Sequence, residues 1–509
     1  MTELTGWERP DATRREFLRR LGVTGLVVAG TSALPATSAA AAGVVAGATV
    51  LSHATVIDAT GAPPQHDMSV VLAGDRIVAV VPSLNIGPVP GGRVVDVRGK
   101  FVVPGLWDMH VHTTVGLESI YLPLYIVNGV TGIREMWGFP RHHELRSQII
   151  CGELLGPRWE IGSTIIDGAQ SWDGVIIVHN EDEARQAVHT TKYEEHADFV
   201  KSYSYLTREA YFAIADESRR LGIRYAGHLP DLVSAVEASD AGQYSFEHLR
   251  DMFICLSDQE AELRAQIAAL PFGPAAPRNF RKLVDELDRQ ALATYSQRRA
   301  EVVFDRLARN RTRHCATLTV LRLFSEPAEF FANDPRLKYL PPSLVASWKQ
   351  KIDRFSPPPE QLPAARQFFQ ARLRLVHDMH RAGVGILAGT DVSNPYCMPG
   401  FSLHDELGLL VRGGLTPMQA LQTATLDAAR YLGMEQSTGT VTAGKSADLV
   451  VLNANPLDDI TNTQRIHAVV VGGRLITSVE RERMLSDLET AANSPALAAA
   501  SLVMAACPC

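Results

Sequence analysis

Through its middle, the chain alternates short apolar runs with longer amphipathic segments. Apolar, valine- and isoleucine-rich runs bounded by polar residues or glycine are typical of buried strands, and helical periodicity marks most of the segments between them. We expect strands at 101–111, 130–136, 158–165, 197–203, 223–228, 243–248, 314–320 and 384–390. Eight strands that alternate with helices predict an α/β fold, a parallel (β/α)8 TIM-like barrel over residues 101–437.

One helix in this region has clear ends. Thr207 is a suitable N-cap, and Gly222 is a suitable terminator for the segment REAYFAIADESRRL between them. Two connections are much longer than a barrel requires, and we expect helical insertions near 250–313 and 322–380. Long insertions on a barrel often shape the pocket or its lid.

Strand-like segments also occur on both sides of the barrel region. Gly74-Asp75 separates two valine-rich runs within residues 43–100, and Gly472-Gly473 has the same position within residues 438–480. Both patterns are hairpin signals. We therefore expect one small composite β-sandwich domain formed from both chain ends, followed by a C-terminal tail at 481–509.

The first 42 residues have a different character. Arg14-Arg15 followed by Phe17-Leu18, a mild apolar run and a stretch of small residues resemble a twin-arginine export signal. We expect residues 1–42 to be a signal peptide, and the mature protein to be periplasmic or extracellular. No later run is apolar and long enough to span a bilayer, so no membrane association is expected after signal removal.

Composition narrows the class of protein. The 509 residues are 46% hydrophobic and 21% charged, as expected for a globular enzyme. The formal net charge of -7 is spread along the chain, and the absence of a basic block argues against a nucleic-acid partner.

The strongest chemical signal is the pair His110 and His112 at the end of the run FVVPGLWDMHVHT. Because side chains alternate along a strand, both imidazoles point to the same side. Two neutral imidazoles on one face can chelate a transition metal. Taken alone, the pair is equally compatible with two partly buried polar residues.

Other predicted strand ends carry groups of the same kind. Lys201, His228, His248 and Asp391 each lie where a predicted strand gives way to a loop. A single such residue is usually structural, but the carboxyl ends of barrel strands meet at one face. We therefore expect a metal centre there.

This set of residues resembles the amidohydrolase superfamily. The segments VVPGLWDMHVH, GLTPMQALQTATLDAARYLGM and GTVTAGKSADLVVLNANPLDDI are similar to the branch related to imidazolonepropionases and prolidase-like dipeptidases. The resemblance covers roughly residues 48–480. Two features depart from that branch: KSYSYLT replaces a glycine-rich turn after the lysine, and the 250–313 insertion is long.

The resemblance implies a role for each residue. His110, His112 and Asp391 would hold one divalent metal ion, His228 and His248 a second, and Lys201 would bridge both as a carbamate derived from carbon dioxide. Zinc is the first expectation for this donor set. A water bridging the metals would lose its proton and attack the amide carbonyl, with Asp391 as the proton shuttle.

Further site candidates are less specific. Tyr203, with Tyr205 on the same side, follows Lys201 and is expected to donate to a developing oxyanion. His404 follows the last strand and is a candidate catalytic residue, or else a helix cap. Arg134 and Trp137 end the second strand; Arg134 suits either a substrate carboxylate or a structural ion pair.

The leading hypothesis is thus an exported binuclear metal-dependent hydrolase. It would act on an amide C–N bond of a small molecule: a dipeptide, an N-acyl amino acid or a cyclic amide. The alternatives are a mononuclear imidazolonepropionase-like or deaminase-like hydrolase, an esterase, lactonase or organophosphate hydrolase, and a metal-free binding protein. Superfamily members are often oligomeric, so a homo-oligomer remains open.

Overall fold

The computed structural model describes residues 46–169, 174–270, 277–494 and 497, and residues 42–509 belong to one compact unit. The predicted signal peptide at 1–42 lies outside the described residues, as does most of the predicted tail beyond residue 494. Within the described ranges, no helix combines the length and the apolar character needed to cross a membrane.

The predicted barrel strands are all present in the described part of the chain. They are β6 (Leu106–Val111), β7 (Val130–Glu135), β8 (Arg158–Ile161), β11 (Phe199–Ser202), β12 (Arg224–Gly227), β13 (Ser245–Glu247), β14 (Arg313–Cys315) and β15 (Ile386–Leu387). Parallel ladders join β6-β7-β8 and β11 through β15. Isolated parallel bridges at Gly162↔Phe199 and Val111↔Val392 connect the ends of these ladders. The strands therefore follow one another in the cyclic order of a TIM-like barrel, which confirms the predicted fold class.

Short strands and helices form the connections between the first barrel strands. Beside β11 lies β9 (Ile166–Asp167), and β10 (Ile176–Ile177) pairs with the other side of β9. The helices are α2 (Glu118–Val127), α3 (Pro140–Ile150), α4 (Glu181–Tyr193), α5 (Arg208–Leu221) and α6 (Ala235–Ala241). In α5 the Thr207 hydroxyl accepts a hydrogen bond from the Ala210 N–H, and Gly222 ends the helix at φ 65°. The predicted ends of this helix are thus confirmed.

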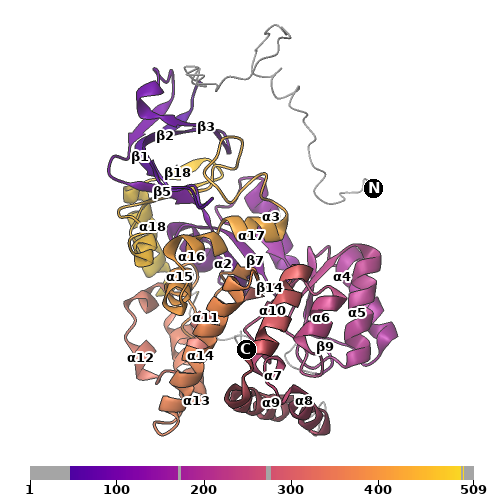
Figure 1. The fold of residues 1–509 in the computed structure, drawn as a ribbon. Coiled ribbons are helices and arrows are strands. Elements are labelled where there is room, and N and C mark those ends of the chain that lie inside the picture. The colour runs from indigo at the N-terminus through magenta and orange to yellow at the C-terminus, as the bar shows by residue number, and fades with distance from the viewer. Residues whose placement is uncertain (1–45, 170–173, 271–276, 495–496, 498–509) are drawn as a thin grey trace. The chain divides into compact units, whose positions relative to one another are not determined.

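Helices also make up both insertions (Figure 1). Between β13 and β14 lie α7 (Met252–Cys255), α8 (Glu260–Ala269), α9 (Pro277–Ala291) and α10 (Gln297–Asn310). Between β14 and β15 lie α11 (Leu318–Arg322), α12 (Glu329–Ala332), α13 (Pro342–Phe355) and α14 (Leu362–Arg381). After β15 the chain forms α15 (Phe401–Gly413), α16 (Pro417–Thr423) and α17 (Leu426–Leu432).

The segments before and after the barrel in the chain form a second sheet. Its strand order is β18-β17-β16-β5-β1-β2-β3, and β4 also pairs with β1. Its strands are β1 (Thr49–Val56), β2 (Gln65–Ala73), β3 (Arg76–Pro82), β4 (Arg93–Asp96), β5 (Phe101–Pro104), β16 (Leu449–Leu452), β17 (Ile466–Val471) and β18 (Arg474–Ile476). The N-terminal and C-terminal strands of this sheet meet where β5 pairs antiparallel with β16. On its other side β5 pairs parallel with β1. Figure 1 shows the N-terminal strands, in indigo, beside yellow β18. Hydrogen bonding makes this domain one branched sheet composed from both halves, rather than two separate sheets.

The predicted strand 101–111 is divided at Gly105. Residues 101–104 form β5 of the second sheet, and β6 begins the barrel only at Leu106. A Cβ at Gly105 would lie 2.1 Å from Oγ1 of Thr131, so the close approach of β7 requires glycine there. The boundary between the two domains therefore lies at Gly105 and not at residue 101.

Two other predicted boundaries differ from those in the structure. The strand expected at 314–320 ends at Cys315, and α11 begins at Leu318 because the Glu406 carboxylate accepts the Leu318 and Thr319 N–H groups. The tail expected from residue 481 is helical up to Ala492, because α18 (Ser478–Ala492) buries Leu488 and Ala492. Arg481 of α18 also donates through Nε to the Val127 carbonyl.

Helix α9 carries Asp288, a buried carboxyl group in the first insertion. Its Oδ1 accepts the Ile254 N–H at 3.2 Å, while burial and the charge of Asp251 raise its pKa from 3.8 to about 7. Since the folded-state pKa is raised, the protonated carboxyl stabilises the fold at low pH, and this contribution is lost as the pH rises through about 7. We therefore compare the free energy of unfolding of Asp288→Asn with that of the wild type at pH 5 and at pH 8.5. On raising the pH, we expect the difference to shift in favour of the variant by on the order of 1 kcal/mol.

Thermal unfolding of both proteins at the two pH values measures this change. The exposed Asp305→Asn on α10 is the matched control and should show no such gain. A stability difference between wild type and Asp288→Asn that does not vary with pH would contradict the raised pKa.

Candidate metal centre

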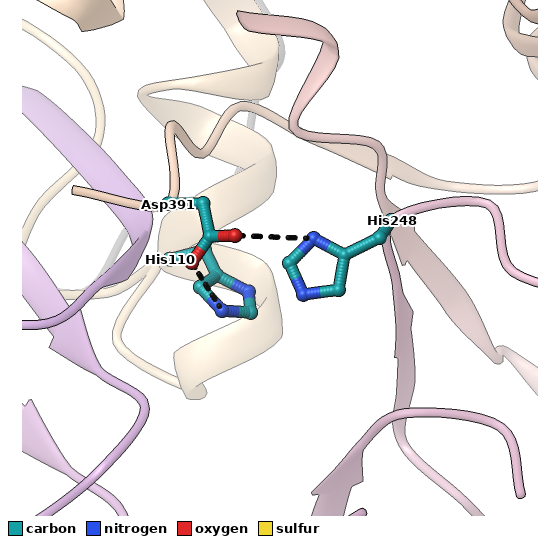
Figure 2. A group of neighbouring side chains, drawn as sticks. All are labelled: His110, His248 and Asp391. Carbon is teal, nitrogen blue, oxygen red and sulfur yellow. Dashed lines mark ion pairs between the residues drawn. The ribbon is translucent and has the colours of Figure 1, made fainter. Parts of the chain in front are cut away.

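The residues predicted to hold metal lie at the carboxyl ends of the barrel strands. His110 is on β6 and His112 follows it; Lys201 is on β11; His228, His248 and Asp391 follow β12, β13 and β15. Their exposed fractions run from 0% to 8%. Asp391 is central: Oδ1 lies 3.4 Å from Nε2 of His110 and 3.2 Å from Nε2 of His112. Its Oδ2 lies 3.7 Å from Nδ1 of His248, so the carboxylate sits between imidazoles (Figure 2).

His228 and Lys201 belong to the same cluster. The His228 ring centroid is 4.8 Å from that of His248, and the Tyr203 ring stacks on His228 at 4.0 Å. Nζ of Lys201 lies 5.8 Å from the Tyr203 ring centroid. The fold thus brings together the six predicted ligands and Tyr203, although they come from five strands.

Neighbouring side chains orient the imidazoles through their Nδ1 atoms. Nδ1 of His110 lies 2.7 Å from Oε2 of Glu247, Nδ1 of His228 is 2.8 Å from Oγ of Ser204, and Nδ1 of His248 is 2.7 Å from Oγ1 of Thr317. Such partners fix the ring orientation and tautomer of metal-binding histidines.

The Nε2 atoms of two histidines in the cluster lack the hydrogen-bond partners that their Nδ1 atoms have. Nε2 of His110 and Nε2 of His228 are buried and have no hydrogen-bond partner among the described residues. A buried nitrogen without a partner costs free energy unless it has a ligand. This observation fits residues that hold a metal ion.

Electrostatics favours a cation as well. Burial lowers the pKa of His110 to about 4 and the pKa values of His228 and His248 well below 6.5, so these imidazoles are neutral at pH 7. Burial alone would raise the pKa of Asp391, but the neighbouring His248 and His110 hold it below its usual range. Donor atoms of His110, His248 and Asp391 all lie within 4.8 Å of one another. Neutral imidazoles with an ionised carboxylate form a donor set that suits zinc and similar divalent ions.

The backbone around the site is strained. His248, Thr317 and Asp391 have φ values of 66°, 47° and 63°, which place them in the left-handed region. They follow three adjacent barrel strands, β13, β14 and β15. Left-handed conformations of non-glycine residues are costly and concentrate at functional sites.

His404 does not lie in this cluster. Its Nε2 is 3.0 Å from the carbonyl oxygen of Asn128, and its Nδ1 is 3.0 Å from Oγ1 of Thr463. Both ring nitrogens therefore connect α15 to other parts of the fold. These contacts do not support the expected catalytic role of His404, which stays a prediction.

The remaining site candidates are Arg134, Tyr205 and Trp137. Arg134 is fully buried and binds Glu247 through Nη2 at 2.9 and 3.0 Å, so it forms a structural ion pair inside the barrel. Tyr205 is buried, and its N–H donates to Oδ1 of Asp167. The Trp137 ring lies 5.2 Å from that of Phe139, beyond the end of β7.

Sequence reasoning missed the residues that support the ligands. Glu247 connects His110 to Arg134, and it directly precedes His248 in the chain. A glutamate inside a predicted barrel strand is a signal for such a role, since a buried carboxylate needs a partner. Thr317 and Ser204 carry no comparable signal, because a hydroxyl is common at any strand end.

Comparison with known proteins supports this architecture. The profile of the Amidohydrolase family matches residues 337–476. A solved bottromycin amidohydrolase superposes with a TM-score of 0.69 at 24% identity, over 87% of this chain and 90% of that one. The family match thus covers the last barrel strand and the second sheet's C-terminal strands, and the solved structure shows a shared fold.

Other similar proteins match at a lower TM-score or over shorter segments. A crystal structure of a Xaa-Pro dipeptidase has a TM-score of 0.61 at 21% identity, covering 84% of this chain and 100% of that one. Ochratoxinase of Aspergillus niger is 36% identical over 118 residues, 21% of this chain and 24% of the relative. Imidazolonepropionase of Pseudomonas paraeruginosa is 42% identical over 84 residues, 16% of this chain and 20% of the relative. The chain thus spans about a quarter or less of the length of these curated relatives.

Proposed function

We propose that this chain is a metal-dependent hydrolase of the amidohydrolase superfamily, and that it cleaves an amide C–N bond of a small molecule. The observation that carries the proposal is the buried cluster of His110, His112, Lys201, His228, His248 and Asp391 at the carboxyl ends of the barrel strands. The names of the relatives, an amidohydrolase and a dipeptidase among them, support an amide substrate.

In this proposal His110, His112 and Asp391 would hold one divalent ion, and His228 with His248 would hold a second. The buried Lys201 amine would react with carbon dioxide, and the resulting carbamate would supply anionic oxygen ligands. Bound divalent ions supply a Lewis acid for the carbonyl and lower the pKa of water.

The chain's own residues then move the proton. The Asp391 carboxylate faces the imidazoles of His110, His112 and His248 and can accept a proton from the attacking water. It returns that proton to the leaving amine. Tyr203, which stacks on His228, would donate a hydrogen bond from its hydroxyl to the oxyanion that develops on the carbonyl oxygen.

Metal content is the first test. We expect about two metal ions per chain, measured by elemental analysis of protein purified with bicarbonate and without chelator. Loss of the metal on chelator treatment should abolish amide hydrolysis, and zinc should restore it. A content near zero after reconstitution would contradict the proposal.

One observation favours a mononuclear alternative. His110, His248 and Asp391 form a compact donor group that could hold a single ion without Lys201. A stoichiometry of about one ion per chain, with activity intact, would support this alternative and leave Lys201 a structural lysine.

We also propose export through the twin-arginine motif at Arg14-Arg15. In a bacterial host, the full chain should appear in the periplasmic or extracellular fraction, and the Arg14→Lys/Arg15→Lys double variant should stay in the cytoplasm. Equal distribution of the two proteins between fractions would contradict export by this route.

A further inference from the structure

Helix α9 of the first insertion contacts the loops that carry two of the predicted metal ligands. Asp231 lies three residues after His228, and Asp251 lies three residues after His248. Arg281 of α9 binds both acids: Nη1 donates to Oδ1 of Asp231, and Nη2 donates to Oδ1 of Asp251 at 3.4 Å. A single guanidinium thus joins the two loops, although it follows these acids in the chain by 50 and 30 residues.

This contact is buried. Asp231 is 1% exposed, Asp251 is 0% exposed, and the side chain of Arg281 is 11% exposed. Among the described residues, Arg281 makes the only hydrogen bonds to these two carboxylates, and the other oxygen of each is buried without a hydrogen-bond partner. Because a buried carboxylate is costly without a cation beside it, both loops depend on Arg281 for their conformation.

On the first loop, Asp231 is connected to its histidine through Ser204. The Asp231 N–H donates to the Ser204 carbonyl at 3.1 Å, and Oγ of Ser204 lies 2.8 Å from Nδ1 of His228. A displacement of Asp231 therefore reaches the residue that orients the imidazole. Loss of such an orienting partner commonly lowers metal affinity by about 10- to 100-fold.

On the second loop, Asp251 belongs to a turn that is costly by itself. His248, Leu249 and Asp251 have φ values of 66°, 56° and 57°, so three of four consecutive residues are left-handed without being glycine. Such a conformation persists only where neighbouring groups enforce it. Arg281 binds the turn at Asp251, whose carbonyl also accepts the Cys255 N–H at 3.1 Å where α7 begins. The position of His248 thus depends on contacts made at the other end of its turn.

Helix α9 is well anchored and can hold the loops. Arg281 also binds Asp285, one turn further along α9, through Nε at 3.0 Å and Nη2 at 2.6 Å. Phe280 and Val284 are buried in the main hydrophobic core, and the Phe280 ring lies 6.5 Å from the Tyr205 ring. The helix therefore sets the direction of the guanidinium, which presents Nη1 and Nη2 to the two loops.

We propose that Arg281 is a positioning residue that holds His228 and His248 in place as ligands of the second metal ion. This inference rests on the proposed two-ion function and deepens it, because it gives the first insertion a part in metal binding. Arg281 acts through the two loop acids, so its loss weakens the binding of the second ion and leaves the site of the first ion intact.

The test withdraws zinc from the metal-loaded full chain with increasing concentrations of a chromophoric chelator, in bicarbonate buffer. It yields a dissociation constant for each ion. In Arg281→Met we expect the constant of the second ion to rise by about 10-fold or more, and that of the first by less than about three-fold. Arg281→Lys keeps the charge but lacks the planar fork, so its second constant should lie between those of the wild type and Arg281→Met. Excess zinc should restore amide hydrolysis in both variants.

Further variants keep the test decisive if Arg281→Met folds poorly, since it leaves two buried acids without their cation. Arg281→Met/Asp231→Asn removes one of these charges and should show the same weakened second ion. Asp285→Asn is the matched control. It removes a charge that Arg281 binds within α9 and leaves both loop contacts, so it should bind both ions as the wild type does.

Thermal unfolding gives a readout that does not require turnover. Because a ligand stabilises the fold in proportion to its affinity, saturating the second site with zinc should raise the unfolding temperature of the double variant less than that of the wild type. Equal second-ion constants in the wild type and the folded variants, or an equal rise in both constants, would leave Arg281 a merely structural arginine and overturn the inference alone. A wild type that releases only one ion would contradict the two-ion proposal, and this inference with it.

Discussion

Lys201→Ala should retain about one metal ion per chain and less than about 1% of wild-type kcat/KM. The expected loss follows from the position of Lys201, which is fully buried on β11 in the same cluster as His110, His228 and His248. Alanine would remove the proposed bridging group and leave His228 and His248 as the only proposed ligands of the second ion. Two neutral imidazoles hold a divalent ion far less tightly than they do with an added anionic oxygen ligand.

Elemental analysis and amide hydrolysis measure both effects. Formate or acetate should restore part of the activity, since a small carboxylate fits the space of the lost bridge. Lys338→Ala, which removes an exposed lysine that binds Glu489, is the matched control and should behave as wild type. An alanine variant with two ions and full turnover would show that Lys201 does not bridge.

Asp391→Asn should lower kcat by about 10³-fold while the protein remains folded. The amide of asparagine keeps the size of the side chain but cannot accept a proton from water. It also removes the negative charge that faces His110, His112 and His248, so weaker metal binding accompanies the loss of turnover. The side chain is fully buried, so solvent does not replace the missing charge.

The rate should be measured at saturating metal across pH 5 to 10, to separate proton transfer from metal loss. Asp240→Asn is a suitable control, because Asp240 is a surface carboxylate bound to Arg306. If Asp391→Asn retains the pH–rate profile of the wild type, another group carries the proton.

The sequence was informative where one local pattern determines one local structure. Alternating apolar and amphipathic runs predicted the barrel strands, and Thr207 with Gly222 predicted both ends of α5. The pair His110 and His112 was recognisable because a strand sets the direction of its side chains.

Features that depend on distant residues could not be predicted in this way. The run 101–107 is continuously apolar, and its division at Gly105 follows from contact with Thr131 on the next barrel strand. Similarly, only the three-dimensional structure shows that His404 is engaged by Asn128 and Thr463. The contact of Arg134 with Glu247 joins two strands across the barrel interior, and no local pattern encodes it.

The pairing of β5 with β16 has a consequence for biosynthesis. Val102 and Val103 pair with Val451 and Val450, so one neighbour of β5 leaves the ribosome only after all the barrel strands. A nascent or truncated chain that ends before Leu449 presents a valine-rich strand with an open edge, which is a template for aggregation. Termination between Asp391 and Leu449 should therefore yield insoluble protein, even though every proposed metal ligand has already been translated.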